Sequence, residues 1–242
     1  FDMDWGREIE AAVWAMTESL PLTPVRPQTR VVDDVTLRAA LNELRQAACD
    51  TIVVLQPIMG DGRLAPILAQ LWREPIVLWA TPERQDSGTV SSCSLVGAHV
   101  FASMFRQLQQ SFEIVYGHPD DDRLKNQLIR AVRLCAGSAH LRQAKVGLVG
   151  NHAPGFINMH ADPMALSDQL GVQLHHFGLQ EFYDVTDGQT AAAVTADVDC
   201  VRQFGLPMDD DIGDDDLTAN SRYYLAMRAL FENENLDALA VR

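Results

Sequence analysis

The sequence predicts an α/β protein with two Rossmann-like domains, in which parallel sheets are flanked by helices. Two observations carry this prediction. Short apolar runs alternate along the chain with longer segments whose apolar residues recur at helical spacing. The same alternation starts again after a long helical segment near the middle of the chain. Apolar strands separated by helices are typical of parallel sheets that are covered on both faces.

The length and the order of the segments suggest where the domains divide. The chain has 242 residues, enough for one large domain or two small ones. We expect a first domain at 1–118 and a second at 119–242, with the linking helix in the second. The chain opens on FDMDWGREIE, which already reads as the start of an amphipathic helix. We therefore expect the first domain to lack its first strand.

The first domain is expected to alternate strands and helices. Helices are expected where apolar side chains share one helical face, at 6–19, 35–48, 63–72 and 94–109. Strands are expected at β-branched or apolar runs, at 29–32, 51–55 (TIVVL), 75–79 (PIVLW) and 112–116 (FEIVY).

The second domain is expected to follow a long helix over 121–136. The sequence HPDDD precedes this helix with acidic residues, and Gly137 is expected to end it. Strands are then expected at three apolar runs, 145–149, 172–176 and 237–241. Further helices are expected between and after the first two of these strands, at 163–170, 190–204 and 216–232.

Composition excludes several classes of partner. The formal net charge of −14 argues against nucleic acid and anionic membranes. No apolar run approaches the roughly 18 residues that a membrane-spanning helix needs. The four cysteines lie far apart and lack metal-site spacing, which favours reduced thiols in a cytoplasmic protein.

Four polar loops follow predicted strands. In parallel α/β sheets, ligands bind outside the carboxyl ends of the strands. The loops at these ends are QPIMGDGR (56–63), ATPERQDSG (80–88), GHPDD (117–121) and GNHAPGFINMH (150–160). We expect the functional residues in these loops.

Several motifs favour a structural interpretation. GDGR lacks both a dinucleotide fingerprint and a P-loop lysine, so it is expected to be a turn that starts a helix. The acidic stretch 208–217 lacks EF-hand spacing, and its last aspartates suit the N-terminus of the helix that follows. The serine-rich run 91–94 opens a helix, where it either caps the helix or grips a polar ligand.

The histidines do not predict a metal site within this chain. His175 and His176 are neighbours on a strand and must point to opposite faces. His152 and His160 are eight residues apart in a loop, and Asp162 is a speculative third ligand. No nucleophile elbow is present. We therefore expect neither metal ligands nor catalytic residues in this chain.

The loop 150–160 leaves three interpretations open. A metal would use its imidazoles, and a sugar would use an amide, imidazoles and an aromatic ring. A plain turn would need only Pro154 and Gly155.

Six segments together resemble a known family. They are FDMDWGREIE, PIVLWATPE, SSCSLVGAH, AKVGLVGNHAPGF, LGVQLHHFGLQEFYD and LDALAVR. In this order and spacing they resemble the amino-terminal and central domains of the L-fucose isomerase/L-arabinose isomerase superfamily, over nearly the whole chain.

The resemblance implies aldose–ketose isomerisation of a pentose, hexose or deoxyhexose through an enediol, assisted by Mn²⁺. The family's metal ligands and carboxylate pair lie beyond a strand like LDALAVR, so this chain has no positions to receive them. We therefore expect this segment alone to be inactive, and its intact parent to be a homo-oligomer, a trimer or a hexamer.

The resemblance also implies residues that contact the sugar. Phe156 would supply an apolar wall, while Asn158 and His160 would bond hydroxyls. Trp79 would place its ring against the sugar, or else be a core residue beneath the end of its strand.

Two other classes of function stay open. One is a non-catalytic, two-lobed sugar-binding module that resembles periplasmic binding proteins. Against it stand the lack of a secretion signal and of an obvious double crossover between lobes. The other is a purely structural assembly domain.

Overall fold

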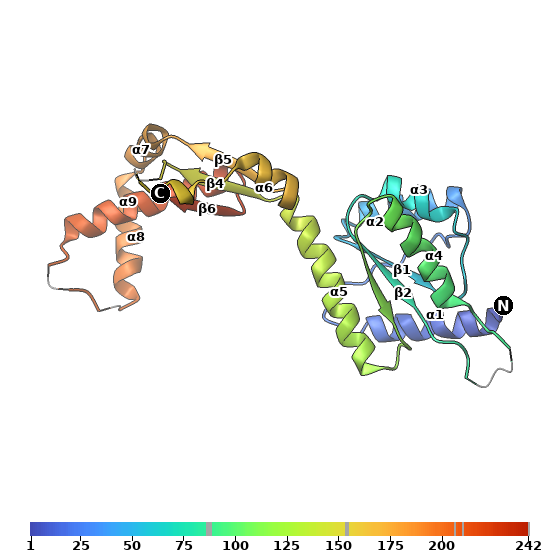
Figure 1. Ribbon diagram of the computed structural model, residues 1–242. Helices are drawn as coiled ribbons and strands as arrows, with labels where there is room; N and C mark the ends of the chain where they lie inside the picture. The colour runs from blue at the N-terminus through green and yellow to red at the C-terminus, as the bar shows by residue number, and fades with distance from the viewer. Residues whose placement is uncertain (86–88, 153–154, 206, 210, 242) are drawn as a thin grey trace. The chain divides into compact units, whose positions relative to one another are not determined.

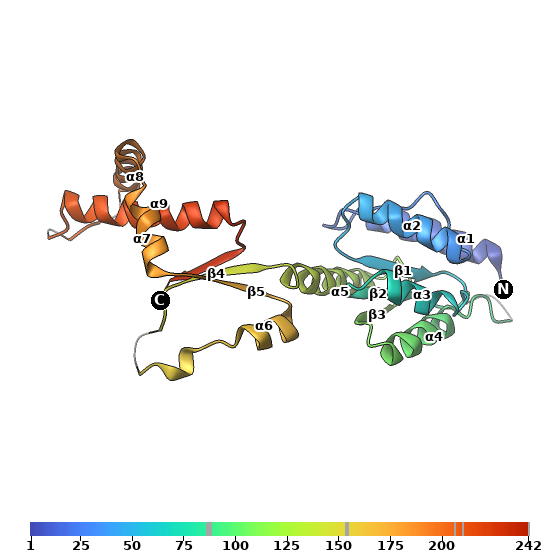
Figure 2. The ribbon, with the colours of Figure 1, turned by 90° about the horizontal axis from the view of Figure 1, so that it is seen from above.

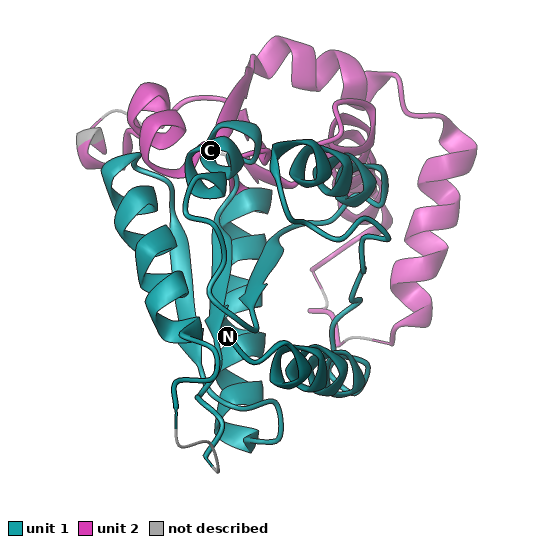
Figure 3. Cartoon of the chain, turned by 90° about the vertical axis from the view of Figure 1, so that its right-hand side faces the viewer, with its two compact units in different colours: residues 1–140 teal, residues 141–242 magenta. Residues whose placement is uncertain are grey.

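The computed structural model describes residues 1–85, 89–152, 155–205, 207–209 and 211–241. The chain forms two compact units, residues 1–140 and residues 141–242, which Figure 3 shows in two colours. Each unit contains one small parallel sheet flanked by helices, which confirms the predicted α/β class. No helix among the described residues is long and apolar enough to cross a membrane.

The first unit is built on a three-stranded sheet in the order β1-β2-β3 (Figure 1). The strands are β1 (Ile52–Gln56), β2 (Ile76–Ala80) and β3 (Phe112–Tyr116), and both pairings are parallel. Every residue of the central strand β2 is buried, because helices cover both faces of the sheet.

Five helices surround this sheet: α1 (Met3–Thr17), α2 (Asp34–Gln46), α3 (Leu64–Leu71), α4 (Ser94–Gln107) and α5 (Asp122–Leu141). Side chains of β2 alternate between two cores. Ile76 and Leu78 pack with α2, α3 and α4. Val77 and Trp79 pack with α1 and α5. This alternation is the period-two pattern of a strand that is buried on both sides.

The second unit has the strand order β5-β4-β6, again all parallel. Its strands are β4 (Lys145–Val149), β5 (Gln173–Phe177) and β6 (Ala238–Val241). Its helices are η1 (Ile157–Met159), α6 (Pro163–Leu170), α7 (Leu179–Asp187), α8 (Ala191–Gln203) and α9 (Asp214–Asn233). Figure 2 shows α7, α8 and α9 on one side of this sheet and α6 on the other.

The helix α5 belongs to the first unit by its packing. Leu124, Leu128 and Cys135 lie in the same core as Val77 of β2. The sequence pattern predicts a division between residues 118 and 119 with this helix in the second domain, whereas the compact units divide after residue 140. Helical periodicity shows which face of a helix is apolar, but not which sheet that face covers.

The predicted strand at 29–32 is wrong. Val31 and Val32 are exposed, and no strand forms there. The Thr29 hydroxyl and backbone N–H donate to the Glu43 carboxylate instead. A β-branched run forms a strand only when a neighbouring strand pairs with it.

One further prediction fails, and one helix was not predicted at all. Gly137 does not end α5, which continues to Leu141 and buries Ala139. The helix α7 was not predicted, although Phe182 and Thr186 are buried on it. The helix α6 ends at Gly171, which adopts the left-handed conformation with φ +79°.

Candidate functional site

The loop after β4 presents its polar and aromatic side chains to solvent. Gly150 leaves the strand with φ +77°, and its N–H donates to the Phe177 carbonyl at 3.0 Å. Phe156, Asn158 and His160 are all exposed, and Phe156 is 55% exposed. Asn158 lies in the short helix η1, which Phe156 precedes and His160 follows.

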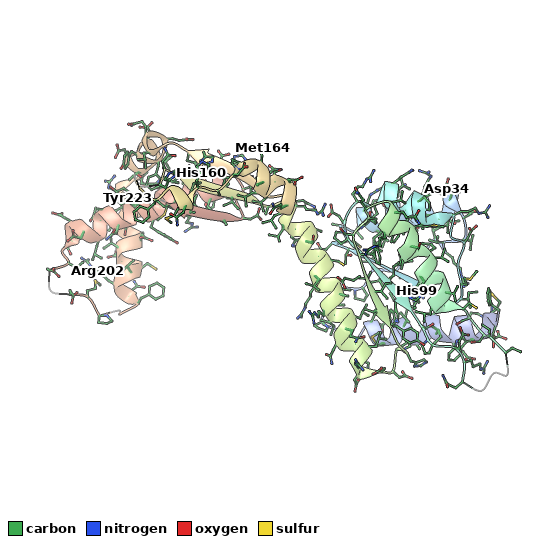
Figure 4. The ribbon with its side chains drawn as sticks, in the orientation of Figure 1. Asp34, His99, His160, Met164, Arg202 and Tyr223 are labelled. Carbon is green, nitrogen blue, oxygen red and sulfur yellow. The ribbon has the colours of Figure 1, made fainter. Side chains whose placement is uncertain are left out.

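The fold brings together two histidines that are eight residues apart in sequence. The rings of His152 and His160 meet edge to face, with centroids 5.9 Å apart. Figure 4 labels His160 on this loop and Met164 on the first turn of α6. The loop therefore carries two imidazoles that are in contact, and Phe156 and Asn158 add an exposed ring and an exposed amide between them in sequence. Pro154 lies outside the described residues.

Trp79 does not join this group. Its side chain is 1% exposed in the core of the first unit, and its Nε1 donates to the Gly117 carbonyl at 3.2 Å. The ring therefore has no open face within its unit. This position matches the core interpretation of Trp79 rather than a direct sugar contact.

The described residues offer no group for the Mn²⁺ that the resemblance implies. No three histidine, cysteine or carboxylate side chains among them gather to hold a metal ion. The Asp162 carboxylate accepts from the Met164 N–H at 2.9 Å and caps α6, so it is used within the fold. The chemistry of this donor set does not fit a metal ion.

The first unit carries a second polar cluster, at the start of α4. The Glu83 carboxylate accepts hydrogen bonds from the N–H groups of Ser91, Ser92 and Cys93 at 2.7–2.8 Å. It also accepts from the hydroxyls of Ser91 at 2.6 Å and Ser92 at 3.1 Å. Partial burial alone would raise the pKa of Glu83, but these hydrogen bonds lower it to about 2. Glu83 therefore stays ionised and holds the segment before α4.

Buried polar groups link the strand ends beside this cluster. The Ser94 hydroxyl accepts from the Thr81 N–H at 2.8 Å and donates to the Gln56 carbonyl. Gly97 permits the close packing, because a Cβ there would lie 2.0 Å from the Gln56 Oε1. The Gln56 Nε2, the Thr81 Oγ1 and the Trp5 Nε1 are buried without a partner among the described residues.

The start of α1 also packs at this edge. Arg84 forms an ion pair with Asp2 at 3.2 Å, and its guanidinium lies 5.8 Å from the centre of the Trp5 ring. Trp5 stacks on His118, with ring centroids 6.1 Å apart. Three loops and one helix start thus meet at the carboxyl edge of the first sheet.

The sequence indicates these loops but does not reveal the residues that organise this edge. It predicts that the serine run either caps a helix or binds a polar ligand. In the structure the run grips a carboxylate of its own chain, Glu83. The signal available in the sequence was an acidic residue shortly before a hydroxyl-rich helix start.

Comparisons with known proteins point to sugar isomerases. No family model matches the chain. Proteins named sulfoquinovose isomerase are 25% identical over 222 residues in Priestia aryabhattai and 22% identical over 193 residues in Alkalicoccus urumqiensis. They cover 91% and 80% of this chain. An L-arabinose isomerase from Saccharophagus degradans is 26% identical over 147 residues, 59% of this chain.

The chain spans about half the length of the two sulfoquinovose isomerases, 49% and 43%, and 29% of the length of the L-arabinose isomerase. The resemblance seen in the motifs therefore holds at the level of sugar isomerases. Among these relatives, the L-arabinose isomerase matches over the smallest share.

Proposed function

We propose that this chain is the substrate-lining and oligomerisation portion of an aldose–ketose isomerase that acts on a monosaccharide. The observation that carries this proposal is the alignment with proteins named as sugar isomerases over 91% of the chain, which includes both units. In the proposed enzyme, both units are Rossmann-like domains of a cytoplasmic protein.

The loop after β4 is the proposed sugar contact. Its exposed Phe156 ring offers an apolar surface to the C–H groups of a sugar. The Asn158 amide and the His160 imidazole have hydrogen-bonding groups for hydroxyls that lose water on binding. Residues 150–160 contain no Arg or Lys, so they suit the neutral hydroxyls of a sugar. The half-buried His152 beside His160 limits the positions that the His160 ring adopts.

In this proposal, the residues that transfer the proton and bind the metal belong to a part of the intact protein outside this chain. The proposed reaction passes through an enediol, with Mn²⁺ and a carboxylate pair supplied by the rest of the intact protein. Residues 1–242 then bind and orient the sugar without moving a proton themselves. Trp79 does not contact the sugar directly in this proposal, because its ring is enclosed in the core. It contributes to the site by fixing the shape of the end of β2.

The test compares the 242-residue chain with the intact natural protein that contains it. Each is incubated with Mn²⁺ and a panel of aldoses that includes sulfoquinovose, L-arabinose, hexoses and deoxyhexoses, and ketose formation is measured. We expect turnover by the intact protein and none above background by the segment. Metal-dependent turnover by the segment would contradict the assignment of the chemistry, and no turnover by either protein would contradict the isomerase.

A non-catalytic sugar-binding module is the second candidate. The exposed Phe156 ring, Asn158 amide and His160 imidazole would serve a module that only binds a sugar as well as they would serve an enzyme. The same assay separates the two candidates if sugar binding is measured beside turnover. Binding by the intact protein without ketose formation would support the module.

A further inference from the structure

The two histidines of the loop after β4, His152 and His160, touch through their rings. The edge of one imidazole meets the face of the other, with ring centroids 5.9 Å apart and an interplanar angle of 72°. No hydrogen bond to either side chain is found among the described residues. Within that part of the chain, the contact is therefore made by the rings alone.

His152 lies close to the end of the second sheet. It follows Gly150 by two residues, and the Gly150 N–H donates to the Phe177 carbonyl at 3.0 Å, which continues the pairing of β4 with β5. The side chain of His152 is half-buried, whereas that of His160 is exposed. His152 is therefore the better anchored ring of the pair, because the sheet fixes the start of the loop.

The backbone of His160 is fixed on both sides, but its side chain projects freely except towards His152. The short helix η1 precedes His160. After it, the Asp162 carboxylate accepts from the Met164 N–H at 2.9 Å and caps α6 (Figure 4). Among the described residues, His152 supplies the one ring contact to the His160 imidazole. Rotation of the His160 side chain is therefore limited by the ring of His152.

We propose that His152 is a positioning residue, which holds the His160 imidazole in the orientation in which it bonds a sugar hydroxyl. This inference rests on the function proposed above, in which His160 contacts the sugar. Ordering a side chain on binding costs entropy, and a ring that is already held has less freedom to lose. The role needs a flat ring at residue 152 but neither of its nitrogen atoms, because the contact is made between rings.

Three variants separate the positioning role from its alternatives. His152→Ala removes the ring, whereas His152→Phe keeps an aromatic ring and removes both nitrogen atoms. The matched control is His140→Ala, which removes an exposed histidine of the first unit that pairs with Asp50. All three variants should unfold close to the temperature of the unaltered chain, because neither histidine belongs to a core cluster of its unit.

The first measurement needs no sugar. Nuclear magnetic resonance of selectively labelled histidine in the 242-residue chain reports the motion of the His160 ring on the picosecond to nanosecond timescale. The ring should be ordered in the unaltered chain and in His152→Phe, and it should become more mobile in His152→Ala. An equally ordered His160 ring in His152→Ala would overturn the proposal, because the contact with His152 would then not be what holds it.

The second measurement uses the intact natural protein and each aldose of the panel described above, which includes sulfoquinovose and L-arabinose. His152→Ala should raise KM by about three- to tenfold, which corresponds to the cost of ordering one side chain, and should leave kcat close to its unaltered value. His152→Phe should restore KM, and His140→Ala should not change it. If His152→Phe binds as weakly as His152→Ala, the nitrogen atoms of His152 contact the substrate and the positioning role is wrong.

His160→Ala distinguishes a failure of this inference from a failure of the proposed function. It should weaken sugar binding by roughly tenfold or more, as expected when a hydrogen-bond partner is lost. If His160→Ala leaves KM unchanged, His160 is not a sugar contact, and the function proposed for the loop fails together with this inference. If His160→Ala weakens binding and His152→Ala does not, the sugar contact stands and His152 is not its positioning residue.

Discussion

The carboxyl edges of the two sheets carry opposite kinds of loop. In the first unit, Glu83 and the serines before α4 use their hydrogen-bonding groups on one another. In the second unit, Asn158 and His160 are exposed, and no hydrogen bond to their side chains is found among the described residues. The comparison shows that a polar loop marks a binding site only where its groups are not already satisfied within the fold.

The difference predicts that substitutions in the first loop change stability, whereas substitutions in the second change binding. All four tryptophans, Trp5, Trp14, Trp72 and Trp79, lie in the first unit. Their fluorescence therefore follows the unfolding of that unit, while circular dichroism follows both.

Replacing Glu83 should have the largest effect. Glu83→Ala leaves the donors of Ser91, Ser92 and Cys93 without their acceptor, so the free energy of unfolding of the first unit should fall by about 2–4 kcal/mol. Urea unfolding followed by tryptophan fluorescence measures the change. Glu83→Gln is the control for shape, and it should also destabilise because its amide nitrogen faces donors. If the urea unfolding midpoints of both variants were unchanged, the hydrogen bonds to Glu83 would not stabilise the first unit.

Gly97→Ala should have the next largest effect. The new Cβ would lie 2.0 Å from the Gln56 Oε1, so the buried amide has to move. We expect a loss of about 1–3 kcal/mol in the unfolding free energy, again seen by tryptophan fluorescence. Gly137→Ala is the control because its Cβ meets open space, and it should not destabilise the chain. Equal losses for both variants would show that helix propensity, not packing, decides the outcome.

Acid should lower the stability that Glu83 gives to the carboxyl edge of the first sheet. The folded pKa of Glu83 is about 2, below its ordinary value of 4.5, so its stabilisation is present above about pH 4.5 and is lost as the pH falls towards 2. Between pH 6 and pH 3 this loss should be about 1–2 kcal/mol, after allowance for solvent screening of a partly exposed group.

The comparison of unaltered chain and Glu83→Gln isolates this contribution. Asp2, Asp33 and Glu43 also have lowered pKa values in the first unit and contribute equally to both proteins. The unfolding free energy should therefore drop more steeply with acid in the unaltered chain than in the variant. Parallel pH profiles would show that Glu83 is not the group responsible.

The second loop should show the smallest change in stability. Asn158→Ala and Phe156→Ala remove exposed side chains, so each should change the free energy of unfolding by no more than about 0.5 kcal/mol, as is usual at surfaces. The melting temperatures should therefore stay close to that of the unaltered chain. In the intact enzyme, the same changes should lower sugar affinity by roughly tenfold to a hundredfold, as expected for a lost contact of about 1–3 kcal/mol. Leu170→Ala, another exposed apolar side chain of the unit, is the control. Unaltered kinetics in both variants would leave the loop as a plain turn.

The candidate site was only partly accessible to sequence reasoning. The loop 150–160 was located because a turn after an apolar strand lies at the carboxyl edge of its sheet, and the structure places it there. The proximity of His152 and His160 depends on how that loop folds back. The role of Glu83 depends on hydrogen bonds to residues eight to ten positions away.

Local patterns determined most of the elements. The strands 112–116 and 145–149 and the helix 163–170 were predicted with the bounds that the structure has, because apolar runs and Pro and Gly signals act within a few residues. The tertiary structure decided those features that depend on contacts between residues far apart in the sequence. Thr29 found Glu43 instead of a neighbouring strand, Trp79 was enclosed between α1 and α5, and α5 continued through Gly137 while packing on the first sheet. In each case the deciding energy is burial or pairing with residues far away in sequence, which local periodicity does not contain.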